Sequence, residues 1–94
     1  MFVYMIKSSR HREYHQENLR LLSAPVGQEM LVRYQRQWVD SDVLRRDLVG
    51  MPLALILGDS PFDSFVPFRL AVITAFDSDD EYVDFTLQLG DYPD

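Results

Sequence analysis

The second half of the chain contains three β-forming runs separated by short polar segments, at residues 52–57, 65–76 and 81–89. The first run reads PLALIL and is apolar at every position, which predicts a fully buried strand. The other two runs are joined by residues 77–80 (DSDD), and turn-forming residues between two such runs predict a β-hairpin. This part of the chain therefore has to fold as a sheet.

Two details of the hairpin refine this prediction. Pro67 interrupts the run 65–76, and because proline cannot donate a backbone hydrogen bond, we expect a bulge or a sheet edge there. The run 81–89 alternates between apolar and polar residues. We expect its apolar side chains to point into the core: Val83, Phe85, Leu87 and Leu89.

The first half of the chain alternates between strand-like and helix-like patterns. Residues 2–7 (FVYMIK) predict a strand, and the helix formers over residues 10–23 predict a helix of about three turns. Residues 29–39 (EMLVRYQRQWV) predict an amphipathic strand, and residues 42–49 predict a short helical turn.

Together these elements predict an α+β fold that is mainly β. Five strands, mostly antiparallel, with one helix after the first strand and a helical turn after the second, suit a small barrel or a strongly bent sheet. SH3-like, OB-like and PUA-like domains share this outline. We expect residues 1–94 to form a single domain, either alone or as the N-terminal module of a longer protein.

Composition narrows the functional classes. The chain has 94 residues, no cysteine and a net charge of -6, so it offers no disulfide, no thiolate metal site and no thiol nucleophile. Residues 1–50 carry eight Lys/Arg and six Asp/Glu, whereas residues 51–94 carry one and nine. The N-terminal apolar stretch is too short for a signal peptide or a membrane span, so we expect a cytoplasmic protein without membrane contact.

One tripeptide raises the question of catalysis. Gly58-Asp59-Ser60 follows an apolar strand and resembles the first sequence block of the GDS-type esterases and lipases, which implies a nucleophilic serine. That chemistry needs a histidine base, which the family carries near its C-terminus, and this chain has no histidine after His15. Pro61 also stands where the family begins a helix. We therefore predict a turn at Ser60 and no catalytic residue.

The sequence does not predict a metal site. His11 and His15 have i, i+4 spacing on the expected helix, but the zinc-protease glutamate is displaced to Glu13. The acidic residues 77–81 lack the ligand spacing and central glycine of a calcium loop. We expect no metal and no cofactor.

A strand that mixes cations, amides and aromatics suggests nucleic-acid binding as an alternative function. Arg33 to Trp38 read RYQRQW, a pattern with which small barrels contact phosphates and stack on bases. Against this, Tyr34 and Trp38 are expected on the core face with Val32. The residues that would contact nucleic acid are Arg10, Arg12, Arg33 and Arg36.

The leading prediction is a non-enzymatic interaction module that docks a protein partner or a neighbouring domain. Residues 60–65 place two phenylalanines among turn formers, which is unusual for a solvated loop. Arg69 is the lone cation of the second half, and we expect it to pair with Asp84, to emerge on the outer face or to grip an anionic partner. The predicted partner-binding residues are Phe62, Phe65, Phe68 and Arg69. A small hydrolase or metal enzyme is the third and least favoured class.

Overall fold

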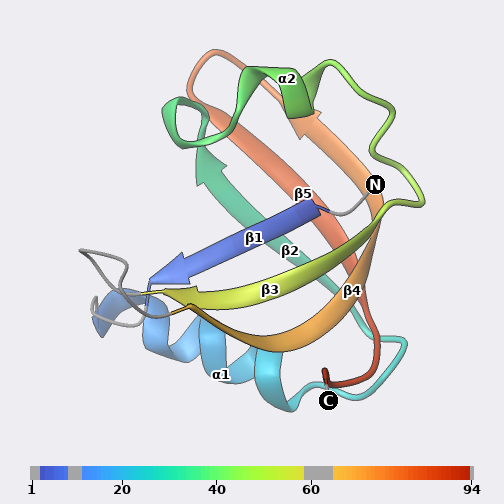
Figure 1. Cartoon of the computed structure of the whole chain (residues 1–94). Helices are drawn as coiled ribbons and strands as arrows, with labels where there is room; N and C mark the ends of the chain where they lie inside the picture. Colours follow the sequence, from blue (N-terminus) through green and yellow to red (C-terminus); the bar gives the residue numbers. More distant parts are fainter. Residues whose placement is uncertain (1–2, 9–11, 59–64, 94) are drawn as a thin grey trace.

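A computed structural model describes residues 3–8, 12–58 and 65–93. These residues form a small α+β domain built on one five-stranded sheet (Figure 1). The elements in chain order are β1 (Val3–Ser8), the 3₁₀ turn η1 (Arg12–Tyr14), α1 (His15–Ser23), β2 (Glu29–Gln35), the 3₁₀ turn η2 (Arg36–Trp38), α2 (Ser41–Leu44), β3 (Pro52–Gly58), β4 (Phe65–Ser78) and β5 (Tyr82–Leu89).

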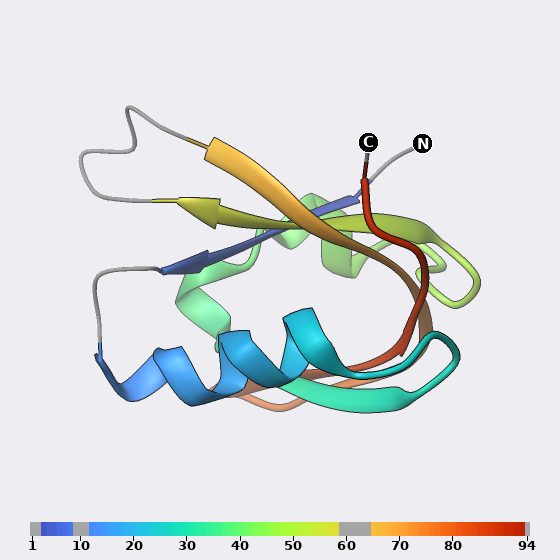
Figure 2. The ribbon, with the colours of Figure 1, turned by 90° about the horizontal axis from the view of Figure 1, so that it is seen from below.

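The sheet has the strand order β1-β3-β4-β5-β2 and is mixed. The β3–β4, β4–β5 and β5–β2 pairs are antiparallel, which confirms the predicted hairpin, whereas β1 runs parallel to β3. The sheet bends around α1 but does not close, so of the two expected forms the barrel is wrong (Figure 2). A closed barrel would pair β1 with β2, and these two strands are the unpaired edges of the sheet.

The core lies on the concave side of the sheet. Every second residue of β3 and β5 points inward, as the alternation in β5 predicted, and registered partners on neighbouring strands share that side. Helix α1 contributes Leu21 and the segment after α2 contributes Leu48, both fully buried. The core side chains are those of Met5, Leu21, Val32, Leu48, Leu53, Leu55, Phe68, Ala71, Ile73, Val83, Phe85, Leu87 and Leu89.

A bulge in β4 sits where the sequence places Pro67. Leu55 pairs with Arg69 and the next residue, Ile56, pairs with Pro67, so Phe68 is an extra residue in β4. Phe68 and Arg69 are consequently both buried on the concave side. Bulges increase the local bend and twist of a strand, and β4 is a curved strand (Figure 1).

The predicted strand 29–39 is shorter in the structure because the chain leaves the sheet after Gln35. The amide of Arg36 still donates to the carbonyl of Glu81, but residues 36–38 then form the turn η2. Trp38 is therefore 75% exposed, and the expectation that it shares the core face with Val32 is wrong.

The helices also begin and end differently from the sequence prediction. Helix α1 starts at His15 after the turn η1, and its N-cap position, Tyr14, forms no side-chain cap. Helix α2 is capped by Asp40, whose carboxylate accepts from the amide of Asp42, but it ends at Leu44 rather than near residue 49. None of the helices in the described ranges is long and apolar enough to cross a membrane.

Candidate functional site

The convex side of the sheet is apolar where it is formed by β1, β3 and the first part of β4. Registered residues on these three strands point outward together: Tyr4 lies beside Ala54 and Leu70, and Ile6 beside Ile56 and Pro67. We call this surface the outer apolar face. It comprises Tyr4, Ile6, Pro52, Ala54, Ile56, Gly58, Phe65, Pro67, Leu70 and Val72, with the polar residue Ser8 at its end beside Gly58.

The outer apolar face exposes large side chains around a covered centre. Tyr4 is 64% exposed, Phe65 49% and Ile6 43%, whereas Ala54 and Ile56 are nearly covered by these neighbours. Gly58 makes the face continuous, because a Cβ there would lie 3.1 Å from the Phe65 ring and 3.2 Å from Cγ2 of Ile6. Among the described residues of this face there is no Asp, Glu, Lys or Arg.

Of the predicted partner-binding residues that the structure describes, Phe65 belongs to this face, whereas Phe68 and Arg69 do not. Phe62 lies outside the described residues, as does Ser60, the residue that resembles an esterase nucleophile. Phe68 packs into the core and Arg69 is fully buried, so neither presents its side chain on the surface. The bulge at Pro67 is the reason, since it turns both side chains inward.

Arg69 donates from Nε and Nη1 to backbone oxygens rather than to a carboxylate, and its buried Nη2 has no hydrogen-bond partner in the described part of the chain. Its Nη1 lies 2.7 Å from the carbonyl oxygen of Ala24 and 3.0 Å from that of Leu22, and its Nε donates to Gly90 at 2.8 Å. The ring of Tyr92 covers the guanidinium, with Cζ 4.3 Å from the ring centroid. Carbonyls at a helix C-terminus lack partners within the helix and carry partial negative charge, so a cation is well placed there.

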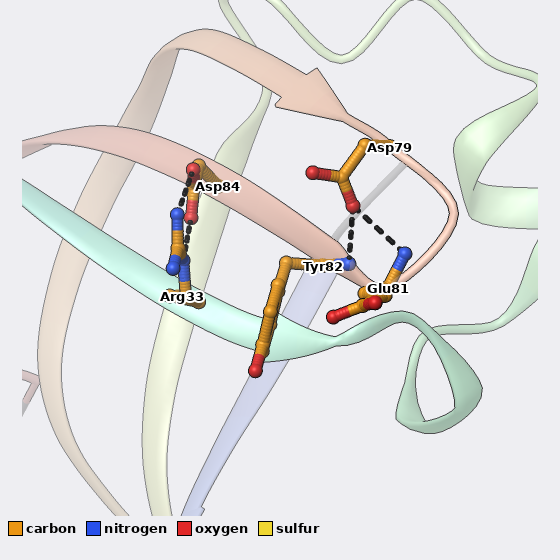
Figure 3. Close-up of polar contacts among 5 residues, drawn as sticks. All are labelled: Arg33, Asp79, Glu81, Tyr82 and Asp84. Atoms are coloured by element: carbon orange, nitrogen blue, oxygen red, sulfur yellow. Dashed lines mark hydrogen bonds and ion pairs between the residues drawn. The ribbon is translucent and has the colours of Figure 1, made fainter.

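The expected Arg69–Asp84 pair is therefore wrong, because Asp84 pairs with Arg33 on the convex side of the β2–β5 pair. Arg33 Nε lies 2.7 Å from Oδ1 of Asp84 and Nη2 lies 3.1 Å from Oδ2, a two-point contact (Figure 3). The guanidinium also covers the ring of Tyr82, with Cζ 4.6 Å from the centroid. The hydrogen bond from Arg33 lowers the pKa of Asp84 below its usual range, and Asp84 in turn raises the pKa of Arg33.

The hairpin turn beside this pair is held by Asp79. Its carboxylate accepts from the amides of Glu81 at 2.7 Å and Tyr82 at 2.8 Å (Figure 3), and these backbone hydrogen bonds lower the pKa of Asp79. Arg36 donates to the carbonyl oxygen of Asp79 at 3.1 Å. This acidic turn thus uses a carboxylate for its own backbone, and the described residues contain no group of three or more side chains suited to hold a metal.

A shallow open depression of ≈ 380 Å³ lies between η2 and this turn. Its lining is polar and of mixed charge: Gln35, Arg36, Gln37, Asp80, Glu81 and Tyr82. Of the four arginines predicted to contact nucleic acid, Arg33 and Arg36 are thus engaged by acidic residues or their backbone. Arg12 lies in η1, and Arg10 and His11 are outside the described residues.

A partly buried ion pair joins the edge strand β1 to α1. Lys7 is 5% exposed and pairs with Glu17, while its Nζ lies 5.5 Å from the ring centroid of Tyr14 and 5.3 Å from that of Tyr34. The Tyr34 hydroxyl donates to the carbonyl oxygen of Ile6 at 3.0 Å, so a side chain of β2 bridges the open edges of the sheet. Burial raises the pKa of Tyr34, and the Glu17 carboxylate adds to the effect.

The sequence does not reveal that Tyr4 and Ile6 face outward. Residues 2–7 predict a strand but do not indicate which side chains point into the core, although Tyr4 and Ile6 alternate with the inward residues Met5 and Lys7. A lysine in phase with Met5 hid this alternation, because an inward lysine is unexpected without knowledge of its partner.

The chain matches no protein-family model, no curated protein and no solved structure. The inference of function therefore depends on the surfaces described above.

Proposed function

We propose that this domain is a non-enzymatic interaction module that docks a protein partner through the outer apolar face. The observation that supports the proposal is the contrast between the two halves of one sheet. The convex side of β1, β3 and early β4 is apolar, whereas that of β2 and β5 carries charged and polar pairs such as Arg33–Asp84.

The exposed area of this face agrees with a binding role. Three strands about 4.8 Å apart and five residues long at about 3.3 Å per residue cover roughly 240 Å² in projection, and side-chain relief raises the accessible area to roughly 400 Å². Contiguous apolar patches of about this size on a monomer are often functional. Removing roughly 400 Å² of apolar surface from water is worth about 10 kcal/mol before the costs of association are subtracted.

The nucleic-acid alternative receives less support from the same contacts. Arg33 already makes a two-point contact with Asp84, and Arg36 donates to the carbonyl oxygen of Asp79 in the acidic turn. Binding to a phosphate backbone depends on cations that are free to replace counterions, and these two are not. We therefore retain protein docking as the proposal.

Photo-crosslinking tests the docking role directly. A benzoylphenylalanine at position 4 should form a light-dependent adduct with the partner, and the adduct should disappear when Val72, 37% exposed on the same face, is replaced by lysine. Position 31 is the matched control, because Leu31 is 61% exposed but lies on the polar half, beside Thr86. Equal adduct yields at positions 4 and 31, or no adduct at position 4, would contradict the proposal.

A further inference from the structure

We infer that the partner of the outer apolar face is a second copy of this chain, which binds through the same face to form a symmetric homodimer. This inference rests on the proposed docking function and names its partner. The charge distribution, the shape and the area of the face support a second copy as the partner.

The charge distribution permits two copies to meet at this face. In a two-fold symmetric contact the same patch is present on both sides, so a net charge in the patch would face itself. The chain carries a net charge of -6, yet the described residues of the outer apolar face contribute no Asp, Glu, Lys or Arg to it. Self-association at this face therefore avoids direct repulsion between like charges.

The bend of the sheet moves the charged half away from such a contact. Figure 2 shows β2 and β5 on the side of the domain opposite β1 and β3. Two sheets that pack face to face lie about 10 Å apart, and charges farther apart than about 8 Å are largely screened at physiological salt. Because the Arg33–Asp84 pair and the acidic turn lie on the side away from the contact, they stay in solvent at the outside of the dimer.

The shape of the face also favours a second sheet over an amphipathic helix. Such helices usually bind in grooves, whereas the outer apolar face lies on the convex side of the bent sheet (Figure 2). Its described residues include no charged side chain. An apolar sheet surface of this kind is complemented by another one, and this chain supplies it.

The area of the face sets the expected affinity. Stable interfaces bury about 800 Å² on each partner, so a face of roughly 400 Å² predicts a weak and reversible dimer. The convex shape limits the contact further. We expect the dimer to have a dissociation constant between about 10 μM and 1 mM.

Sedimentation equilibrium from about 1 μM to 1 mM protein tests this inference over the range that such an affinity requires. The average mass of the wild-type chain should rise with concentration from 11.0 kDa toward twice that value. Tyr4→Lys and Val72→Lys should each weaken the association at least about tenfold, because each buries a cation opposite an apolar surface. Leu31→Lys, on the polar half, should behave like the wild type, and circular dichroism of each variant checks that it is folded.

The outcomes separate this inference from the docking proposal. A chain that remains at 11.0 kDa throughout, or a dimer that tolerates both Tyr4→Lys and Val72→Lys, overturns the homodimer. If the position-4 crosslink then joins a different protein, the docking role stands and the second-copy inference fails. If neither a dimer nor a position-4 adduct forms, both proposals fail.

Discussion

The guanidinium of Arg69 lies 2.7 Å from the carbonyl oxygen of Ala24, and this contact joins the middle of β4 to the end of α1. The same side chain donates to Gly90, which follows β5. A single buried cation therefore connects three segments that are far apart in the sequence. It also explains how a mainly apolar strand tolerates an arginine without a carboxylate partner.

Replacing Arg69 should destabilise the fold strongly. Arg69→Met keeps most of the apolar stem but leaves the partly buried carbonyl oxygens of Ala24 and Gly90 without their donor, while that of Leu22 keeps only the Tyr92 hydroxyl. Each such loss costs about 1–3 kcal/mol, so we expect the free energy of unfolding to fall by about 3 kcal/mol or more. Urea denaturation measures this, and a change below about 0.5 kcal/mol would show that Arg69 does not hold these segments.

The phenylalanines of β4 should differ sharply in their effect on stability. Phe68 is 9% exposed in the core, so Phe68→Ala removes a buried ring and should cost about 3–5 kcal/mol of unfolding free energy. Phe65 is 49% exposed on the outer apolar face, so Phe65→Ala should cost about 1 kcal/mol or less. Thermal and urea unfolding of the two variants compare them directly, and similar losses would contradict the inward turn at the bulge.

The strands could be predicted from the sequence because their signals are local. The alternation of residues 81–89, the apolar run 52–57 and Pro67 each indicate structure within a few residues, and the hairpin, the buried strand and the bulge are confirmed. The parallel pairing of β1 with β3 joins segments about 50 residues apart, and no local pattern encodes it. The choice between a barrel and an open sheet depends on that pairing.

The surfaces were harder to predict because their determinants are not local either. The acceptors of Arg69 are backbone oxygens, which leave no side-chain signature in the sequence. The outer apolar face was hidden because β3 and early β4 are apolar at nearly every position, so inward and outward residues read alike. Only the register of β1, β3 and β4 separates them.

Removing one charge of the Lys7–Glu17 pair should lower the free energy of unfolding more than replacing both charged residues together. Glu17→Gln leaves the Lys7 ammonium unpaired while its side chain is 5% exposed, whereas Glu17 itself is 33% exposed and partly hydrated. We expect a loss of about 1–3 kcal/mol, below the value for a fully buried pair. The double variant Lys7→Met with Glu17→Gln removes the stranded charge and should recover part of that loss. A double-mutant cycle by urea denaturation measures the coupling, and additive losses would show that the pair is not coupled.

Acid should weaken the fold through Asp79 and Asp84. Both carboxyls have a pKa below the usual 3.8, Asp79 because of two backbone hydrogen bonds and Asp84 because of the hydrogen bond from Arg33. A carboxyl whose pKa is lower in the folded state stabilises that state when ionised. Its contribution is fully present above the ordinary pKa and is lost as the pH falls through the folded-state pKa, so stability should decline below about pH 4.

The variants Asp79→Asn and Asp84→Asn isolate this contribution. Each should be less stable than the wild type at pH 7, and the difference should shrink as the pH is lowered toward about 2, because protonation removes the same charge from the wild type. Asp80→Asn is the matched control, since it removes one charge from the same turn, and in the described part of the chain its carboxylate has no hydrogen bond or ion pair. Urea unfolding at a series of pH values measures the three differences. If Asp80→Asn shows the same pH dependence, the effect comes from the net charge of the turn and not from the contacts in Figure 3.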